Sequence, residues 1–227
     1  RTATAEFKSD HVIALWSDRE LMLGGDKTTQ VYYNSGASPM PFEAIRTGRI
    51  IYGVAAPQSV AIVNNTSHFL AQDANGGVFV ARMNGYTVER VSTRTMENLW
   101  AGYTDFEDAF AMAVHWRGHE FYVLTFDKAD TTLGRTFVFD ASTGLWFELG
   151  PYQASIGDFS KWPVRAHAFF NGMNIVGDSD GTLHKLSDTV FTFNGTTMIA
   201  LRRAPIIHQD RQRMFVHKLQ LDLETGT

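Results

Sequence analysis

The fold is decided by a stretch that runs, over residues 110–147, FAMAVHWRGHEFYVLTFDKADTTLGRTFVFDASTGLWF. Three segments of it are rich in aromatic and β-branched residues, and they span 110–114, 121–126 and 135–139. Arg117 and Gly118 supply a turn after the first segment. Asp140 to Gly144 supply another after the third, because Asp bonds turn amides and Gly takes positive φ. Alternation bounded by turns predicts antiparallel strands joined by hairpins.

The same pattern recurs three more times along the chain. Its strand segments are 11–15 and 31–33, then 59–63, 69–70 and 78–81, then 166–170, 173–176 and 182–186. Aligning the first hairpin of each unit places Trp16, Asn64, Trp116 and Phe170 in register, at spacings of 48, 52 and 54 residues. A repeat near 50 residues predicts an all-β fold of β-propeller-like blades. The alternative is a β-sandwich with coincidental hairpin spacing, because both architectures use short strands and regular turns.

One helix interrupts the strands. Ser92 is placed to cap a short helix over residues 93–101, where Met96, Leu99 and Trp100 form an apolar face at helical spacing. The prolines at 39 and 41 exclude a central strand there and predict a connecting loop.

Composition limits the class of protein. Of 227 residues, 44% are apolar and 19% are charged, against roughly 25% charged in average globular proteins, which predicts a packed core. The net charge of −4 excludes a generally basic surface that coats nucleic acid. No apolar stretch approaches the ~20 residues of a membrane-spanning helix. With no cysteine, the chain has no disulfide, thiol nucleophile or cysteine-held metal, and we predict no cofactor.

The repeat also predicts the domain organisation. Residues 1–200 are expected to form a partial propeller of about four blade-like units, and residues 201–227 the start of a further β unit. This further unit rests on a predicted strand over 215–221, followed by Asp222 to Gly226 with the spacing of the turn at Asp140 to Gly144. Because the chain starts at Arg1 and stops at Thr227, before any return strand, we expect the unit to be truncated.

Patterns typical of metal sites have simpler explanations here. His115 and His119 have the spacing of helical metal ligands, but they flank a predicted hairpin, where the side chains separate along the strands. The segments 73–76 and 178–181 resemble the start of a calcium loop, yet neither has a carboxylate downstream within reach. We therefore predict turns at these places and no metal.

Acidic residues offer the one enzymatic alternative, because many propellers are glycosidases, which need two or three acids converging on one pocket. The candidate acids are Asp105, Glu107, Asp108, Asp127 and Asp130. Most of them lie in predicted loops or near a helix cap, where an acid already has a structural role. No G-x-S-x-G or phosphate-binding glycine loop is present, so we predict no catalytic residue.

Four arginines lie within twelve residues near the C-terminus: Arg202, Arg203, Arg211 and Arg213. Guanidinium groups bind carboxylates and phosphates, so these residues are candidate contacts for a partner protein or a DNA backbone. A solvated strand face is the alternative explanation for the same pattern.

Several runs, taken in their order, resemble one viral family. They are 10–15, 30–36, 41–43, 56–60, 85–92, 118–126 and 140–146. These runs are similar to the packaged-DNA stabilisation proteins of short-tailed bacteriophages, also called tail hub or tail accessory factors. The resemblance extends over about residues 5–227.

The resemblance implies a non-enzymatic virion protein, made in the host cytoplasm. Family members form a hexameric propeller ring below the portal and its adaptor ring, retain packaged DNA without sequence specificity, and mount the tail needle or the fibres. A conduit that does not grip phosphate allows DNA to slide out, so we expect acids such as Asp105, Glu107 and Asp108 to line it. A carbohydrate-binding or glycan-degrading propeller is the alternative.

Overall fold

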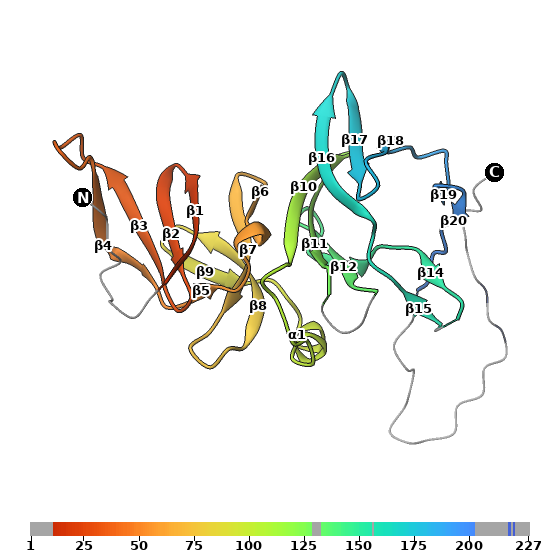
Figure 1. Cartoon of the computed structure of the whole chain (residues 1–227), viewed down its shortest axis with the longest axis horizontal. Coiled ribbons are helices and arrows are strands. Elements are labelled where there is room, and N and C mark those ends of the chain that lie inside the picture. The colour runs from red at the N-terminus through yellow and green to blue at the C-terminus, as the bar shows by residue number, and fades with distance from the viewer. Residues whose placement is uncertain (1–10, 129–132, 156, 203–217, 219, 221–227) are drawn as a thin grey trace.

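The computed structural model describes residues 11–128, 133–155, 157–202, 218 and 220. The secondary structure of these residues is mostly antiparallel β-strand with one short α-helix, which confirms the predicted all-β class (Figure 1). No helix in these ranges is long and apolar enough to cross a bilayer.

The first two sheets are built from strands that follow one another in sequence. The first sheet has the order β1-β2-β3-β4, with bounds Val12–Asp18, Glu20–Gly25, Thr29–Asn34 and Phe42–Ile50. The second has the order β5-β7-β8-β9, with bounds Gly53–Val54, Thr66–Gln72, Val78–Asn84 and Thr87–Arg90. A further short strand of this sheet, β6 (Ala61–Val63), also pairs with β7. The 3-10 turn at Pro57–Ser59 lies between β5 and β6 in the chain. Both prolines, at 39 and 41, lie in the loop between β3 and β4, as predicted.

The third and fourth sheets repeat this order. The third consists of β10 (Phe110–Trp116), β11 (His119–Phe126), β12 (Arg135–Asp140) and β13 (Leu145–Glu148). The fourth consists of β16 (Val164–Phe170), β17 (Met173–Asp178) and β18 (Leu183–Lys185). Two small hairpins flank it, formed by Tyr152–Gln153 with Asp158–Phe159 (β14, β15) and Thr192–Phe193 with Thr196–Thr197 (β19, β20).

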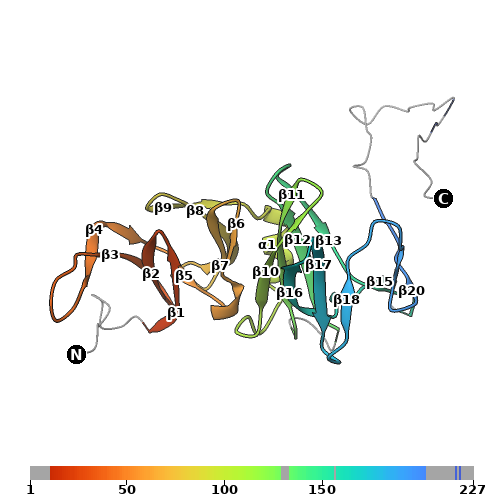
Figure 2. The same ribbon diagram turned by 90° about the horizontal axis from the view of Figure 1, so that it is seen from above.

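The sheets stack face to face in chain order, and each junction has its own apolar core. Both views show them following one another along the molecule (Figures 1 and 2). In β7, Phe69 and Ala71 pack toward the first sheet, whereas Leu70 between them packs toward the third. In β11, Tyr122 packs toward the second sheet and Val123 toward the fourth. One sheet thus covers two neighbours through its alternating faces, which is blade packing and differs from the single core of a sandwich.

Two-residue hairpins set the register of three sheets. Asn64 and Asn65 have φ of 51° and 53° between paired Val63 and Thr66, and Arg117-Gly118 and Asn171-Gly172 occupy the same kind of turn. Positive φ at both central residues matches the twist of the flanking strands, and Asn and Gly adopt it at low cost. The predicted alignment is correct for Trp116 and Phe170, which both precede the turn. In the second sheet the aligned residue, Asn64, is itself the first residue of the turn, one position later than expected. In the first sheet, Trp16 lies three residues before the turn residue Arg19.

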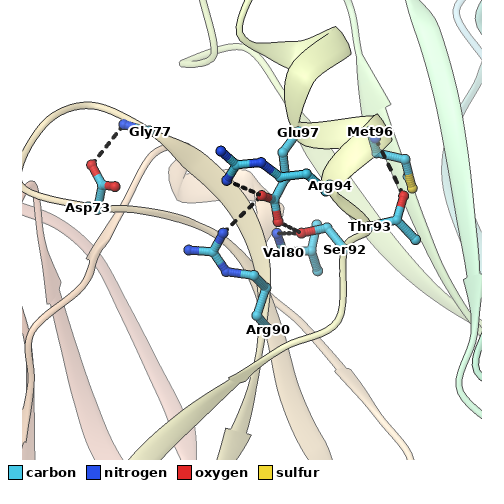
Figure 3. Close-up of polar contacts among 9 residues, drawn as sticks. All are labelled: Asp73, Gly77, Val80, Arg90, Ser92, Thr93, Arg94, Met96 and Glu97. Atoms are coloured by element: carbon cyan, nitrogen blue, oxygen red, sulfur yellow. Dashed lines mark hydrogen bonds and ion pairs between the residues drawn. The ribbon is translucent and has the colours of Figure 1, made fainter.

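The helix α1 (Arg94–Trp100) lies within the predicted span, but its cap differs from the prediction. Thr93 caps it, accepting a hydrogen bond from the Met96 amide at 3.4 Å (Figure 3). Ser92 is unavailable because its hydroxyl donates to Glu97 at 2.8 Å and accepts from the Val80 amide at 3.1 Å. The buried apolar side chain is Trp100, while Leu99, predicted to share that face, is 40% exposed.

Four blade-like units therefore occupy residues 12–185. Residues 203–217, 219 and 221–227, on which the prediction of a further β unit mainly rests, lie outside the described residues. The division of the chain at residue 200 stays a prediction.

Candidate partner-binding surface

The three predicted acids lie in one segment, between α1 and β10. Asp105 and Glu107 are exposed and Asp108 is partly buried. The Glu107 amide donates to the Asp105 carboxylate at 2.9 Å, which folds the segment into a tight turn. Their role as conduit-lining acids stays a prediction.

The surroundings of Asp108 disfavour the ionised form of its carboxyl group. Both of its carboxylate oxygens are buried, and within the described residues neither accepts a hydrogen bond. The nearest cation is the Lys128 ammonium at 3.8 Å. Burial, followed by repulsion from Asp105, raises the pKa of Asp108 above its usual value. This side chain therefore destabilises the folded chain when it is ionised.

Asp127, which directly follows β11, has the opposite environment. One carboxylate oxygen accepts a hydrogen bond from Lys161 and the other from Arg165. Burial alone would raise the pKa of Asp127, but these two cations outweigh burial and lower it. Asp127 thus links the end of β11 in the third sheet to Lys161 and to Arg165 of β16 in the fourth sheet.

The arrangement offers little to a glycosidase. Both oxygens of Asp127 accept hydrogen bonds from cationic side chains, so this carboxylate already has a structural role in the fold. Asp130 lies outside the described residues. Two cavities, of about 920 and 220 Å³, are lined by other residues than Asp105, Glu107, Asp108 and Asp127.

An aspartate stands at the end of one strand in each sheet: Asp26 directly follows β2, Asp73 follows β7, Asp127 follows β11, and Asp178 is the last residue of β17. Asp73 accepts hydrogen bonds from the amides of Asn75 and Gly77, and Figure 3 shows the one from Gly77. Asp178 accepts hydrogen bonds from the amides of Asp180 and Thr182. The predicted turns at 73–76 and 178–181 are thereby confirmed. This recurrence was not predicted from the sequence, although an aspartate at the end of a strand in each unit was a usable signal.

The histidine pair lies at a hairpin, as predicted. His115 is opposite Glu120, and His119 is opposite Trp116. The His119 ring contacts the nearly buried Asp140 carboxylate at 2.7 Å, so it supports the β12–β13 turn. In the part of the chain that the structure describes, no group of three or more His, Asp or Glu is arranged to hold a metal ion.

The arginine cluster is described only in part. Arg202 is exposed. Arg203, Arg211 and Arg213 lie outside the described residues. Their role as partner or DNA contacts stays a prediction.

An apolar cavity of about 920 Å³ separates the third sheet from the segment after β18. Trp116, Phe121 and Phe147 line it on one side, and Leu186 and Phe193 on the other. At the preceding junction the corresponding apolar space contains Trp100 of α1, packed on Phe126 with ring centroids 5.4 Å apart. This cavity was not predicted from the sequence, because its lining residues come from segments far apart in the chain.

A comparison of the sequence with models of known protein families assigns the chain to one of them. The family model for phage stabilisation proteins, described as "Bacteriophage P22 Gp10, beta-propeller", matches residues 1–191. The chain belongs to this family. It is therefore a structural protein of a short-tailed phage that stabilises packaged DNA, with the virion as its location. A search of curated proteins returns no match.

Membership in the phage stabilisation family confirms the resemblance drawn from the ordered runs and the propeller-like fold. The family is a structural one. The matched region contains the acidic segment and all four sheets, and it ends before the arginine cluster.

Proposed function

We propose that the chain is a subunit of a ring-shaped tail hub below the portal and its adaptor, where it retains packaged DNA and mounts the tail needle or fibres. Family membership together with the stack of four sheets supports this role. The subunits are made in the host cytoplasm and join the virion at the portal. A hexamer is the expected stoichiometry.

A hub that holds pressurised DNA must resist deformation. The junction between the second and third sheets is packed with aromatic side chains, as at Trp100, which contacts both Phe126 and Phe137. Close packing of this kind has low compressibility. A closed ring further needs two different, complementary surfaces on each subunit. The chain's two end sheets provide different surfaces, since the first is four-stranded and the fourth is three-stranded.

The acidic segment gives the hub a way to release DNA. Asp105 and Glu107 are exposed, and Asp108 lies beside them. In this proposal they face the conduit and repel phosphate, so that DNA is retained by enclosure instead of by adhesion. The arginines at 202, 203, 211 and 213 instead contact acidic groups of the adaptor.

The ring assignment is tested on virions and on purified protein. Mass spectrometry of purified particles is expected to detect the chain, and negative-stain images should place it in a ring below the portal–adaptor complex. Particles assembled without it should package DNA and then lose it. Absence from virions contradicts the proposal. Turnover of polysaccharide by a monomeric protein supports the glycan-degrading alternative.

The conduit assignment has its own experiment. Substituting Asp105→Lys and Glu107→Lys together is expected to slow DNA ejection several-fold and to make ejection more sensitive to salt, because phosphate then binds the wall. Asp180→Lys, at an exposed turn of the fourth sheet, is the matched control. Equal ejection rates for both variants would place the acidic segment away from the DNA.

A further inference from the structure

Two adjacent phenylalanines are exposed at the tip of the β16–β17 hairpin. Phe169 and Phe170 are 67% and 68% exposed, and they point to opposite faces of β16 because side chains alternate along a strand. Figure 1 shows this hairpin projecting beyond the neighbouring sheets. Residues 166–177, which form its outer part, contain no Asp, Glu, Lys or Arg. A projecting, uncharged aromatic tip indicates a surface that binds a partner.

The hairpin is held in place below its tip. The His167 ring nitrogen Nε2 lies 2.8 Å from the side-chain oxygen of Asn174, and the Asn174 amide nitrogen donates to the His115 carbonyl at 2.9 Å. The turn at Asn171 and Gly172 has positive φ at both residues, which suits a two-residue hairpin. The two phenylalanines are therefore presented on a preorganised element, and this lowers the entropy cost of binding.

The cavity of about 920 Å³ is a concave surface of matching chemistry. Its lining is mostly apolar and includes Trp116, Phe121 and Phe191. Phe191 is 57% exposed, so the cavity opens to solvent. Its volume lies within the roughly 300–1,000 Å³ of pockets that enclose drug-sized ligands, which gives room for two phenylalanine side chains. None of residues 166–175, all of which the structure describes, lines this cavity, so the tip and the cavity are separate surfaces of one chain.

The charged groups around the cavity favour an uncharged occupant. Arg117 forms an ion pair with Asp188 at 3.4 Å, and the His184 ring contacts the Asp178 carboxylate at 3.0 Å. Lys185 is exposed, so its ammonium group can stay in water while its apolar stem lies against the cavity. An uncharged tip that enters the cavity therefore buries no new charge without a partner, whereas a charged occupant would.

We propose that Phe169 and Phe170 of one copy of the chain insert into the cavity beside Phe191 of a second copy. The tip and the cavity are different surfaces, so each copy gives one contact and receives another, and contacts of this head-to-tail kind can close into a ring. The inference rests on the proposed tail-hub ring and names the surfaces that join its subunits. Two phenylalanines bury about 300–500 Å², less than the roughly 1,200 Å² of a stable interface, so they are the central anchor of a larger contact.

Cross-linking between two single-cysteine proteins tests the contact, because the chain contains no cysteine of its own. Met173→Cys, at the tip, and Ser187→Cys, in the cavity lining, are made in separate copies of the 227-residue chain, mixed, and treated with a short bismaleimide. The mixture should give a cross-linked dimer, whereas either protein alone should not. In the control, Asp180→Cys, beyond the other end of β17, replaces Met173→Cys and should give about tenfold less dimer. Equal yields, or dimers of Met173→Cys alone, overturn the proposal.

A second measurement separates this contact from the ring itself. Adding Phe169→Ser and Phe170→Ser to the Met173→Cys protein should lower the yield about tenfold, and Phe169→Leu with Phe170→Leu should keep most of it, because leucine is also apolar. Circular dichroism checks that each variant is folded. An unchanged yield with the serine pair overturns the proposal. Analytical ultracentrifugation reports the size of the unmodified chain: a ring without the tip-to-cavity cross-link overturns this inference alone, whereas a monomer at every concentration contradicts the proposed ring as well.

Discussion

Hydrogen bonds between side chains and backbone fix how neighbouring sheets are oriented. The Tyr122 hydroxyl donates to the Ser59 carbonyl at 2.7 Å, and the Trp146 indole donates to the Val91 carbonyl at 2.8 Å, so both link the third sheet to the second. Asn174 likewise links the fourth sheet to the His115 carbonyl at 2.9 Å. Apolar contacts are non-directional, whereas these bonds select one arrangement.

The Tyr122 bond gives the first prediction. Tyr122→Phe should lower the free energy of unfolding by about 1–3 kcal/mol, because the Ser59 carbonyl then lacks its donor at a buried site. Urea denaturation measures the change. Tyr86→Phe is the control: its hydroxyl donates to Glu20 at the surface, and its loss should leave the free energy of unfolding essentially unchanged. Equal effects of the two substitutions would contradict the orientation argument.

Asp108 gives a second prediction at this scale. Its pKa is raised in the folded chain, chiefly by burial and next by Asp105, so the folded state binds the proton more tightly than the unfolded state does. Stability therefore rises as pH falls through that pKa. At pH 7, Asp108→Asn removes the unfavourable charge and should raise Tm by about 2–4 °C, which corresponds to on the order of 1 kcal/mol.

Calorimetry at two pH values checks this sign. The gain from Asp108→Asn should shrink as the pH is lowered toward 4, because the native carboxyl then becomes neutral as well. Glu107→Gln, an exposed neighbour, should leave Tm unchanged at both pH values. A lower Tm for Asp108→Asn at pH 7 would show that Lys128 compensates the charge.

At the scale of elements, α1 is held by its buried glutamate more than by its cap. The Glu97 carboxylate is 8% exposed and accepts hydrogen bonds from Ser92 and Arg90, each at 2.8 Å (Figure 3). Ser92 in turn accepts from Val80 in β8. A seven-residue helix is too short to be stable alone, so this network and the burial of Trp100 fix it between two sheets.

The network predicts an order of effects. Glu97→Ala should lower the free energy of unfolding by about 2–3 kcal/mol, because it leaves the Ser92 hydroxyl and Arg90 without their acceptor. Thr93→Ala, which removes the cap, should cost about 1 kcal/mol. Arg94→Ala is the control, since Arg94 is 82% exposed and 3.9 Å from Glu97, and its effect should be close to zero. Chemical denaturation of the three variants ranks them; a larger loss for Thr93→Ala than for Glu97→Ala would contradict this account.

At the scale of the whole molecule, stability is shared between nearest neighbours. Three separate cores join the four sheets, and each inner sheet contributes to two of them. Such stacks behave as a series of units coupled to their neighbours. A defect in one core should therefore loosen the two sheets that form it before it reaches the others.

Hydrogen exchange measures this directly. Trp100→Ala, which costs about 3–5 kcal/mol, should speed amide exchange in the second and third sheets. Met22→Ala, a defect in the first core, should speed exchange in the first and second sheets and leave β10 to β13 protected. Uniform acceleration across all four sheets in both variants would indicate one cooperative unit.

The sequence by itself determined the secondary structure and its repeat. Alternation and turn residues act locally, so strands such as 121–126 and hairpins such as Asn171-Gly172 were predictable without knowing what they pack against. The ordered runs also sufficed to indicate the phage family, because they do not depend on distance in space. The acids at 105, 107 and 108 were found for the same reason, since they are adjacent in the chain.

The tertiary structure alone decided which partners each side chain meets. Thr93 replaces Ser92 as the cap because the Ser92 hydroxyl already accepts a hydrogen bond from the amide of Val80, twelve residues away. Asp127 has a lowered pKa and Asp108 a raised one because Lys161 and Arg165 approach only the former closely enough to bond. Both outcomes depend on residues distant in sequence whose positions follow from the stacking of sheets. Electrostatic and hydrogen-bond energies fall steeply with separation, so local patterns do not encode them.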